Sequence, residues 1–208
     1  MAYNDFTLEQ LNQDFGIAIQ SHPDLFANRL QPATLSSTFR DYLDYNAKLA
    51  LAISTEKARS EMIIAPILVE LKRMTGDRIS LFSGTQFDVD ASQGLTGFCD
   101  YLISLSDQQF FIQAPVVVLF EAKNENIKGG LPQCIAAMVA AQIFNRRKAN
   151  GIETIYGAVT TGNQWKFLQL HQKTACIDAN DYYIDRLDQI MGILMQMVTP
   201  QGHPLPTP

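Results

Sequence analysis

The 208-residue sequence predicts one α/β or α+β domain organised around a single buried strand. Three observations support this prediction. Helical periodicity dominates the first third of the chain, short runs of β-branched and aromatic residues follow, and helical patterns then separate the remaining strands. With 47% hydrophobic residues, the chain is long enough for one sizeable core and short for two.

The N-terminal third predicts two helices separated by a short extended segment. Thr7 and Gln10 have the spacing of a capping box, and Gly16 is a suitable residue to end that first helix. Residues 17–33 predict a strand fragment and a loop. A longer helix is expected to begin at Thr34 or Ser36, because apolar residues then recur at helical spacing.

The middle of the chain predicts a kinked helix followed by short strands. A helical pattern runs from about Glu56 to Met74, and Pro66 should kink it because proline removes one backbone donor. Short strands are expected at Ile79 to Phe82 and at Phe87 to Val89, on either side of a turn at Ser83-Gly84.

Two further strands follow, at Phe98 to Ser104 and from Val116 to Lys123, and they are expected to pair. Gly129-Gly130 predicts a break, after which Pro132 suits the first position of a strongly apolar helix that ends near Arg146.

The last part of the chain predicts a hairpin and a final helix. Strands at Ile155 to Thr160 and Trp165 to Leu170 are separated by a plausible turn. A helix is expected from about Asp185 to Met197, and the proline-rich segment Thr199 to Pro208 predicts disorder.

Charge and cysteine content narrow the class of protein. Sixteen basic and 21 acidic residues give a formal charge of −5, which does not favour a protein that coats nucleic acid non-specifically. The three cysteines lie in apolar surroundings, so buried thiols in a reducing cytoplasm are expected. The first residues resemble no signal peptide, and no apolar run approaches the roughly 20 residues of a membrane span. We therefore expect a soluble, cytoplasmic protein.

The strand from Val116 ends in charged residues that share one face. Side chains alternate along a strand, so Glu121 and Lys123 point to the same side. Asp100 lies on the preceding predicted strand and can face Glu121 across the ladder. Two carboxylates about 4 Å apart repel by roughly 1–4 kcal/mol, and a divalent cation between them would convert that cost into binding. Oxygen ligands favour Mg²⁺ or Mn²⁺. The alternative is that Glu121 and Lys123 form only a local salt bridge.

These residues resemble the motif of the PD-(D/E)xK nucleases. Asp100 is followed 21 residues later by Glu121-Ala122-Lys123, and Gln133 resembles the glutamine often found in the next helix. Glu61 resembles the acidic residue of the family's first core helix. The segment around Glu61 is similar to the N-terminal nuclease domains of type I restriction motor subunits. Cys99 stands where the proline of the family name would be.

The resemblance covers roughly residues 56–170 and implies a restriction-endonuclease-like fold. This fold has a central mixed sheet flanked by helices, with the core order α-β-β-β-α-β. Residues 1–55 would form an N-terminal helical extension, 56–198 the nuclease-like domain and 199–208 a flexible tail.

The resemblance also implies roles for individual residues. Asp100 and Glu121 would bind Mg²⁺ or Mn²⁺ together with the backbone carbonyl of Ala122 and support from Glu61. Lys123 would position the attacking water and Gln133 would help to orient water or phosphate. The implied reaction is hydrolysis of phosphodiester bonds in nucleic acid, with DNA the expected substrate.

Other interpretations stay open at this point. The chain could be a module of the same fold that binds nucleic acid or scaffolds a larger complex without cutting. The alanine-rich helix from Ile135 to Ala141 suggests a homodimer or a partner subunit. Glu61 could simply face solvent, and Gln133 alone would be an ordinary polar residue at a helix start.

Overall fold

The computed structural model describes residues 2–26 and 30–199. Within these ranges, eight strands form one mixed open sheet in the order β1-β7-β6-β5-β4-β3-β2, with β8 paired to β6. The strands are β1 (Ala18–His22), β2 (Ser80–Gln86), β3 (Phe98–Ser104), β4 (Val116–Ala122), β5 (Thr154–Thr160), β6 (Gln164–His171), β7 (Thr174–Asp178) and β8 (Tyr182–Tyr183).

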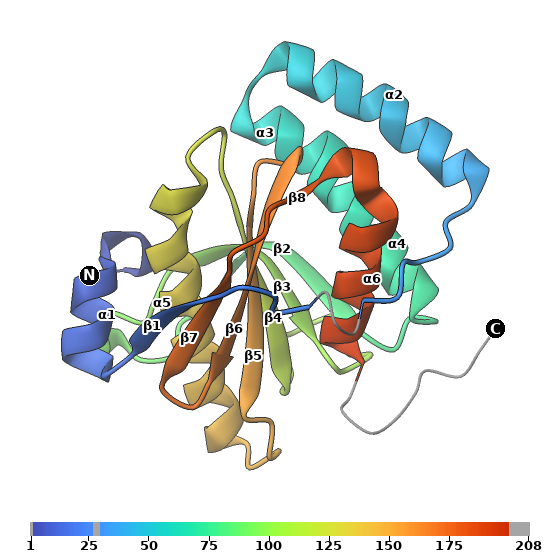
Figure 1. Cartoon of the computed structure of the whole chain (residues 1–208). Helices are drawn as coiled ribbons and strands as arrows, with labels where there is room; N and C mark the ends of the chain where they lie inside the picture. Colours follow the sequence, from blue (N-terminus) through green and yellow to red (C-terminus); the bar gives the residue numbers. More distant parts are fainter. Residues whose placement is uncertain (1, 27–29, 200–208) are drawn as a thin grey trace.

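Helices cover both faces of the sheet, so the protein is an α/β protein of three layers (Figure 1). Helix α5 lies on one face together with α1, and α2, α4 and α6 lie on the other. The helices are α1 (Leu8–Phe15), α2 (Ser37–Ile53), α3 (Glu56–Arg59), α4 (Ala65–Met74), α5 (Ile127–Arg147) and α6 (Leu187–Val198).

The central strand β4 is buried along its whole length, as its continuous apolar run predicts. It pairs antiparallel with β3, where Tyr101 is opposite Phe120 and Leu102 is opposite Leu119. On its other side it pairs parallel with β5. Each face of the sheet has its own apolar cluster, so β4 contributes to both layers of the core.

The N-terminal segment belongs to this sheet. Strand β1 pairs parallel with β7 at the sheet edge, from Ala18 opposite Thr174 to His22 opposite Asp178. Residues 1–55, which the sequence resemblance treats as a helical extension, thus contribute a strand as well as α1 and α2.

Most local predictions are confirmed. Thr7 and Gln10 form the reciprocal capping box of α1, and Gly16 ends the helix in the left-handed conformation. Ser36 caps α2 through a hydrogen bond from the Phe39 backbone N–H. The β5–β6 hairpin and α6 also lie where the sequence predicts them.

The predicted helix from Glu56 to Met74 is confirmed as one continuous helical segment, and its irregularity is a widened turn just before Pro66. A π-helical turn at Ser60–Ile64 separates α3 from α4, and Pro66 lies in the first turn of α4. The Ala65 N–H bonds the Ser60 carbonyl five residues back, so the widened turn lies directly before Pro66, the residue that lacks a helical donor.

The prediction of a turn at Ser83-Gly84 is wrong. β2 continues through both residues, and Phe87 to Val89 forms no strand. Gly84 has a φ of +57°, which glycine adopts at little cost, so the strand bends there without ending. The pairs Ser83 with Tyr101 and Thr85 with Cys99 place this bend beside Asp100.

The start of α5 also differs from the prediction. The helix begins at Ile127, Asn126 caps it by accepting a hydrogen bond from the Gly129 N–H, and Pro132 lies inside it. The two glycines that predict a break are therefore helical. Strands β7 and β8 are not among the elements predicted from the sequence. Most of the segment predicted to be disordered, 200–208, lies outside the described residues.

Helix α5 is the core helix of its layer. By length and composition it could cross a membrane, contrary to the expectation that no segment approaches such a length. However, 67% of its most apolar window is buried inside the protein. Packing against the sheet therefore accounts for its apolar character.

Candidate functional site

The two carboxylates of the predicted motif come together at the end of β4. The β3–β4 register pairs Tyr101 with Phe120, and its next step places Asp100 opposite Glu121. Residues directly opposite each other in an antiparallel pair point to the same face. The Asp100 Oδ2 also accepts a hydrogen bond of 2.7 Å from the Ala122 backbone N–H, which ties this carboxylate to β4.

Lys123 completes this group. Its backbone N–H donates to the Thr160 carbonyl at 2.8 Å, so the residue is still held by the neighbouring strand β5. Its Nζ lies 2.5 Å from Glu121 Oε1 and donates more weakly to Gln133 Oε1 at 3.4 Å. The structure thus brings Asp100, Glu121, Lys123 and Gln133 together from β3, β4 and α5.

Gly130 allows helix α5 to approach this group. A Cβ at this position would lie 2.7 Å from Val159 Cγ1 and 3.2 Å from both Cγ and Cε of Lys123. The lysine side chain therefore passes over the bare backbone of the helix. This contact explains why a glycine stands inside the first part of α5.

Burial dominates the electrostatics of Glu121, whose residue surface is only 4% exposed. Burial and then the charge of Asp100 raise the pKa of Glu121 to about 8, although Lys123 opposes the shift. Burial also raises the pKa of Asp100, against the stabilising Ala122 N–H. Near neutral pH, Glu121 is therefore largely protonated in the metal-free protein.

For the pKa of Lys123, neighbouring carboxylates outweigh burial. Burial lowers its pKa, but the hydrogen bond to Glu121 and the surrounding carboxylates outweigh burial, so the net direction is upward. The amine therefore stays protonated at neutral pH. It can position a water molecule or offset negative charge, but it is a poor general base.

Glu56 is a site residue that the sequence reasoning missed. Glu56 is an exposed residue in the first turn of α3, and its negative charge contributes to the raised pKa of Asp100, Glu121 and Lys123. Thr55 starts that helix by accepting a hydrogen bond from the Ala58 N–H. The capping pattern at Thr55 fixes Glu56 in the first turn of α3. This pattern is the sequence signal from which the position of Glu56 could have been predicted.

The structure does not bring Glu61 into the same group. Its Oε1 lies 3.0 Å from Lys57 Nζ, and both side chains are exposed. Among the carboxyl groups of the site, Glu61 affects neither Asp100 nor Glu121, although its charge raises the pKa of neighbouring Tyr101. Its predicted role in supporting a metal stays a prediction, and the solvent-facing alternative describes its position.

Cys99 packs directly behind the carboxylates. It is buried, and burial followed by the charges of Glu121 and Asp100 raises its pKa to about 12. Its thiol is therefore neutral and unsuited to act as a nucleophile. Cys134 is buried as well, but Cys176 is partly exposed, so the expectation of three buried thiols is wrong for that residue.

Two carboxylates with adjacent backbone oxygens fit the needs of a hard divalent cation. Across residues 2–26 and 30–199, no group of three or more His, Cys, Asp or Glu side chains is arranged to hold a metal. Mg²⁺ commonly uses only one or two protein carboxylates and keeps several waters. Asp100 and Glu121 meet that requirement, and the Ala122 carbonyl remains a predicted third ligand.

Arg59 brings a further positive charge to this end of the sheet. Its Nη1 donates to the Thr161 carbonyl at 3.2 Å, next to the Thr160 carbonyl that holds Lys123. Its Nε is buried and has no hydrogen-bond partner. Such an orphan donor is costly unless a polar ligand or water satisfies it.

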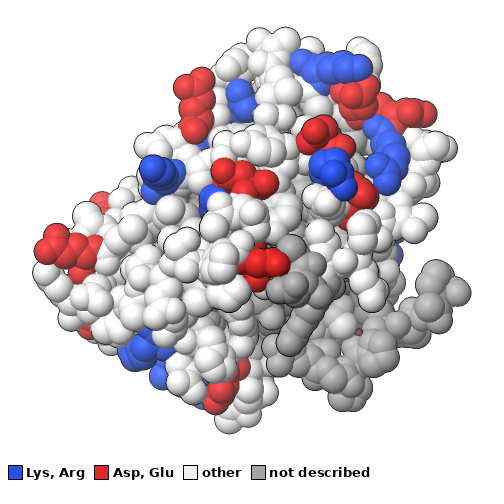
Figure 2. All heavy atoms as spheres, viewed as in Figure 1, with Lys and Arg blue, Asp and Glu red and all other residues white. Residues whose placement is uncertain are grey.

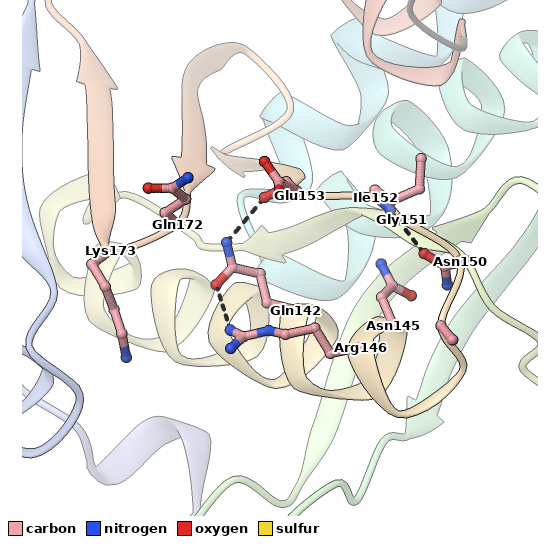
Figure 3. Close-up of a pocket in the computed structure, with 10 residues that line it drawn as sticks. Gln142, Asn145, Arg146, Asn150, Gly151, Ile152, Glu153, Gln172 and Lys173 are labelled. Atoms are coloured by element: carbon pink, nitrogen blue, oxygen red, sulfur yellow. Dashed lines mark hydrogen bonds between the residues drawn. The ribbon is translucent and has the colours of Figure 1, made fainter.

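A cavity of about 550 Å³ lies elsewhere, at the other end of α5 (Figure 3). Gln142 crosses its wall, donating to the Glu153 carbonyl at 3.2 Å and accepting from Arg146 at 3.5 Å. Asn145 lines the same cavity and binds the backbone of Val116, the first residue of β4. Because Glu121 lies near the last residue of β4, this cavity is separate from the carboxylate group.

Comparisons with known proteins assign no family to the chain. No family model matches it, and no curated protein matches it. The fold is established as an α/β protein with a mixed open sheet. The resemblance to PD-(D/E)xK nucleases is a hypothesis that depends on Asp100, Glu121 and Lys123.

Proposed function

We propose that this chain is a PD-(D/E)xK-type nuclease that hydrolyses phosphodiester bonds with a divalent metal, Mg²⁺ or Mn²⁺. The observation that carries the proposal is the convergence of Asp100 and Glu121 on one face, with Lys123 Nζ 2.5 Å from Glu121 Oε1. Ionising buried Glu121 beside Asp100 is costly without a compensating cation, because the single charge of Lys123 balances only one of the two carboxylates.

The residues divide the work as follows. Asp100 and Glu121 would hold the cation, and the Ala122 N–H fixes the orientation of Asp100. When bound, the cation supplies a water of lowered pKa and stabilises charge on the phosphate. Lys123 remains protonated, so it orients that water or offsets the developing negative charge.

Gln133 acts as a positioning residue in this proposal. Its Oε1 accepts from Lys123 Nζ, so its amide nitrogen is directed away from the lysine and can donate to water or to a phosphate oxygen. Arg59, whose Nη1 is anchored to the Thr161 carbonyl, adds a second positive charge near the site. Nucleic acid, with DNA expected, is the substrate class that this combination suits.

One competing function has a specific observation in its favour. Figure 2 shows acidic and basic side chains interspersed over the visible face, without a continuous positive area. The chain also has a net charge of −5. A module of this kind that binds nucleic acid weakly, or that scaffolds a larger complex without cutting, would need no such area.

Incubation with DNA and RNA substrates, single- and double-stranded, in Mn²⁺ or Mg²⁺ separates the two functions. We expect metal-dependent cleavage by the native protein and none by Asp100→Asn, which preserves the side-chain shape. Native protein that binds Mn²⁺ but cuts no substrate of the panel supports the non-catalytic module. Equal cleavage by the Asp100→Asn variant contradicts the assignment of the site.

A further inference from the structure

Helix α2 carries two apolar stripes, and only one of them is buried. Leu43, Ala47 and Ala50 face the core. On another side of the helix, four large apolar residues are exposed by 44–72%: Tyr42, Tyr45, Leu49 and Ile53. We call these four residues the α2 stripe.

The α2 stripe has the spacing of a helix-pairing surface. Its members are separated by three, four and four residues, so they follow one side of the helix over almost three turns. Figure 1 shows α2 at the periphery, covered on one side by α3 and α4. The main packing partners of α2 are the π-helical turn at Ser60–Ile64 and α3, whereas the four stripe residues are exposed to solvent. Contiguous exposed apolar residues of this size mark an interaction site.

We propose that the α2 stripe is a two-fold interface at which α2 pairs antiparallel with α2 of a second copy of this chain. This proposal does not depend on the nuclease function. It replaces the sequence-based reason for a dimer, because every residue from Ile135 to Ala141 is buried in the core and cannot contact a partner.

The charges beside the α2 stripe favour a second copy of this chain as the partner and set the relative direction of the two α2 helices. Asp41 and Lys48 each immediately precede a stripe residue, Tyr42 and Leu49, so they flank the stripe on the same side. In an antiparallel two-fold pair whose axis passes near Tyr45, the middle residue of α2, Asp41 of each copy lies near Lys48 of the other, and symmetry forms the ion pair twice. A parallel pair sets identical residues level with each other and forms neither ion pair.

The intramolecular partner of Lys48 leaves it able to make this contact. Lys48 Nζ lies 2.6 Å from Asp44 Oδ2, but both side chains are largely exposed. Such exposed pairs contribute little to stability, so the lysine can also reach Asp41 of a second copy at small cost.

Sedimentation equilibrium of the full chain over a wide concentration range tests the interface. We expect a monomer–dimer equilibrium, and we expect Leu49→Lys to weaken it at least tenfold. The helical signal should stay unchanged, and the melting temperature should equal that of the native protein at concentrations where both are monomeric. Phe110→Lys is the matched control, because Phe110 is 96% exposed outside the stripe. A protein that is monomeric at every concentration, or a dimer that is indifferent to Leu49→Lys, overturns the proposal.

Charge reversal tests the direction. Asp41→Lys and Lys48→Asp should each weaken the dimer severalfold, because each places like charges together twice. The double variant Asp41→Lys/Lys48→Asp should regain most of the affinity, because it restores both ion pairs in reversed order. A double variant as weak as the sum of the single variants overturns the antiparallel arrangement.

Discussion

Polar groups are buried at both ends of β4, but the two ends differ in hydrogen bonding and in charge. At its first residue, Val116, the backbone N–H donates to Asn145 Oδ1 at 2.9 Å and the carbonyl accepts from Asn145 Nδ2 at 2.7 Å. This neutral side chain is completely buried and uses both ends of its amide. At the other end, buried Glu121 has a raised pKa and a single lysine shared among several carboxylates. A satisfied neutral amide indicates a structural role, whereas unbalanced buried charge indicates a site.

The strongest test of this contrast is the effect on cleavage at the charged end. Asp100→Ala and Lys123→Ala should each reduce cleavage by about a thousandfold or more, because they remove a metal ligand and the cation beside the reacting phosphate. Asn145→Ala should retain the specific activity of whatever protein remains folded. Single-turnover cleavage under saturating Mn²⁺ measures this, and a Lys123→Ala variant that cuts at the native rate would refute the assigned role.

A substitution at the Val116 end of β4 should lower the free energy of unfolding rather than the cleavage rate. Asn145→Ala leaves the N–H and carbonyl of Val116 buried without partners, which should cost about 2–4 kcal/mol of unfolding free energy. Urea denaturation measures this loss. Gln13→Ala, at an exposed position whose side chain donates a hydrogen bond to Glu9, should change stability by less than about 0.5 kcal/mol. Equal losses for the two variants would mean that Asn145 does not anchor β4.

Glu121, at the other end of β4, should also make the unfolding free energy of the metal-free protein depend on pH. Glu121 has a pKa of about 8 when folded and 4.5 as its ordinary value, so the folded state holds a proton that the unfolded state has lost. Stability from this group is therefore fully present below about pH 4.5 and is lost as the pH rises to about 8. Glu121→Gln should flatten this part of the profile. A native profile that rises between pH 5 and 8 even after subtraction of the Glu121→Gln profile would contradict the sign.

The smallest expected effect is a difference in Mn²⁺ affinity between variants of two glutamates on the same helical segment. Glu56→Gln should weaken Mn²⁺ binding severalfold, because the charge of Glu56 acts on Asp100 and Glu121. Glu61→Gln should leave binding nearly unchanged, because Glu61 is paired with Lys57 in solvent. Calorimetric titration of both variants measures the difference. The reverse order would restore Glu61 to the role that the sequence resemblance gives it.

The sequence predicts the site better than it predicts the elements that support it. Strand alternation, together with the assumption that consecutive strands pair, was enough to place Asp100 and Glu121 on one face, because alternation can be read from the local sequence. The continuity of β2 through Gly84 was missed, since glycine signals a turn and a bend in a strand equally well. Gly130 was misread for a related reason, because its purpose is the close approach of Lys123 and Val159 from distant parts of the chain.

The choice between Glu56 and Glu61 shows a second limit. Both residues lie on one helical segment, and an ideal α-helix predicts which of them faces the sheet only if it stays regular. The π-helical turn at Ser60–Ile64 changes the angle between the residues on either side of it. Pro66 predicts an irregular helix here but not the type or the size of the irregularity, so the resemblance alone assigned Glu61 to the site.

Mn²⁺ binding at pH 8, followed by electron paramagnetic resonance, tests the central claim most directly. We predict one bound Mn²⁺ per native chain, with protons released as Glu121 ionises, and loss of that ion in Asp100→Asn. Native protein that leaves millimolar Mn²⁺ free, or an Asp100→Asn variant that binds it as tightly, would contradict a metal centre between β3 and β4.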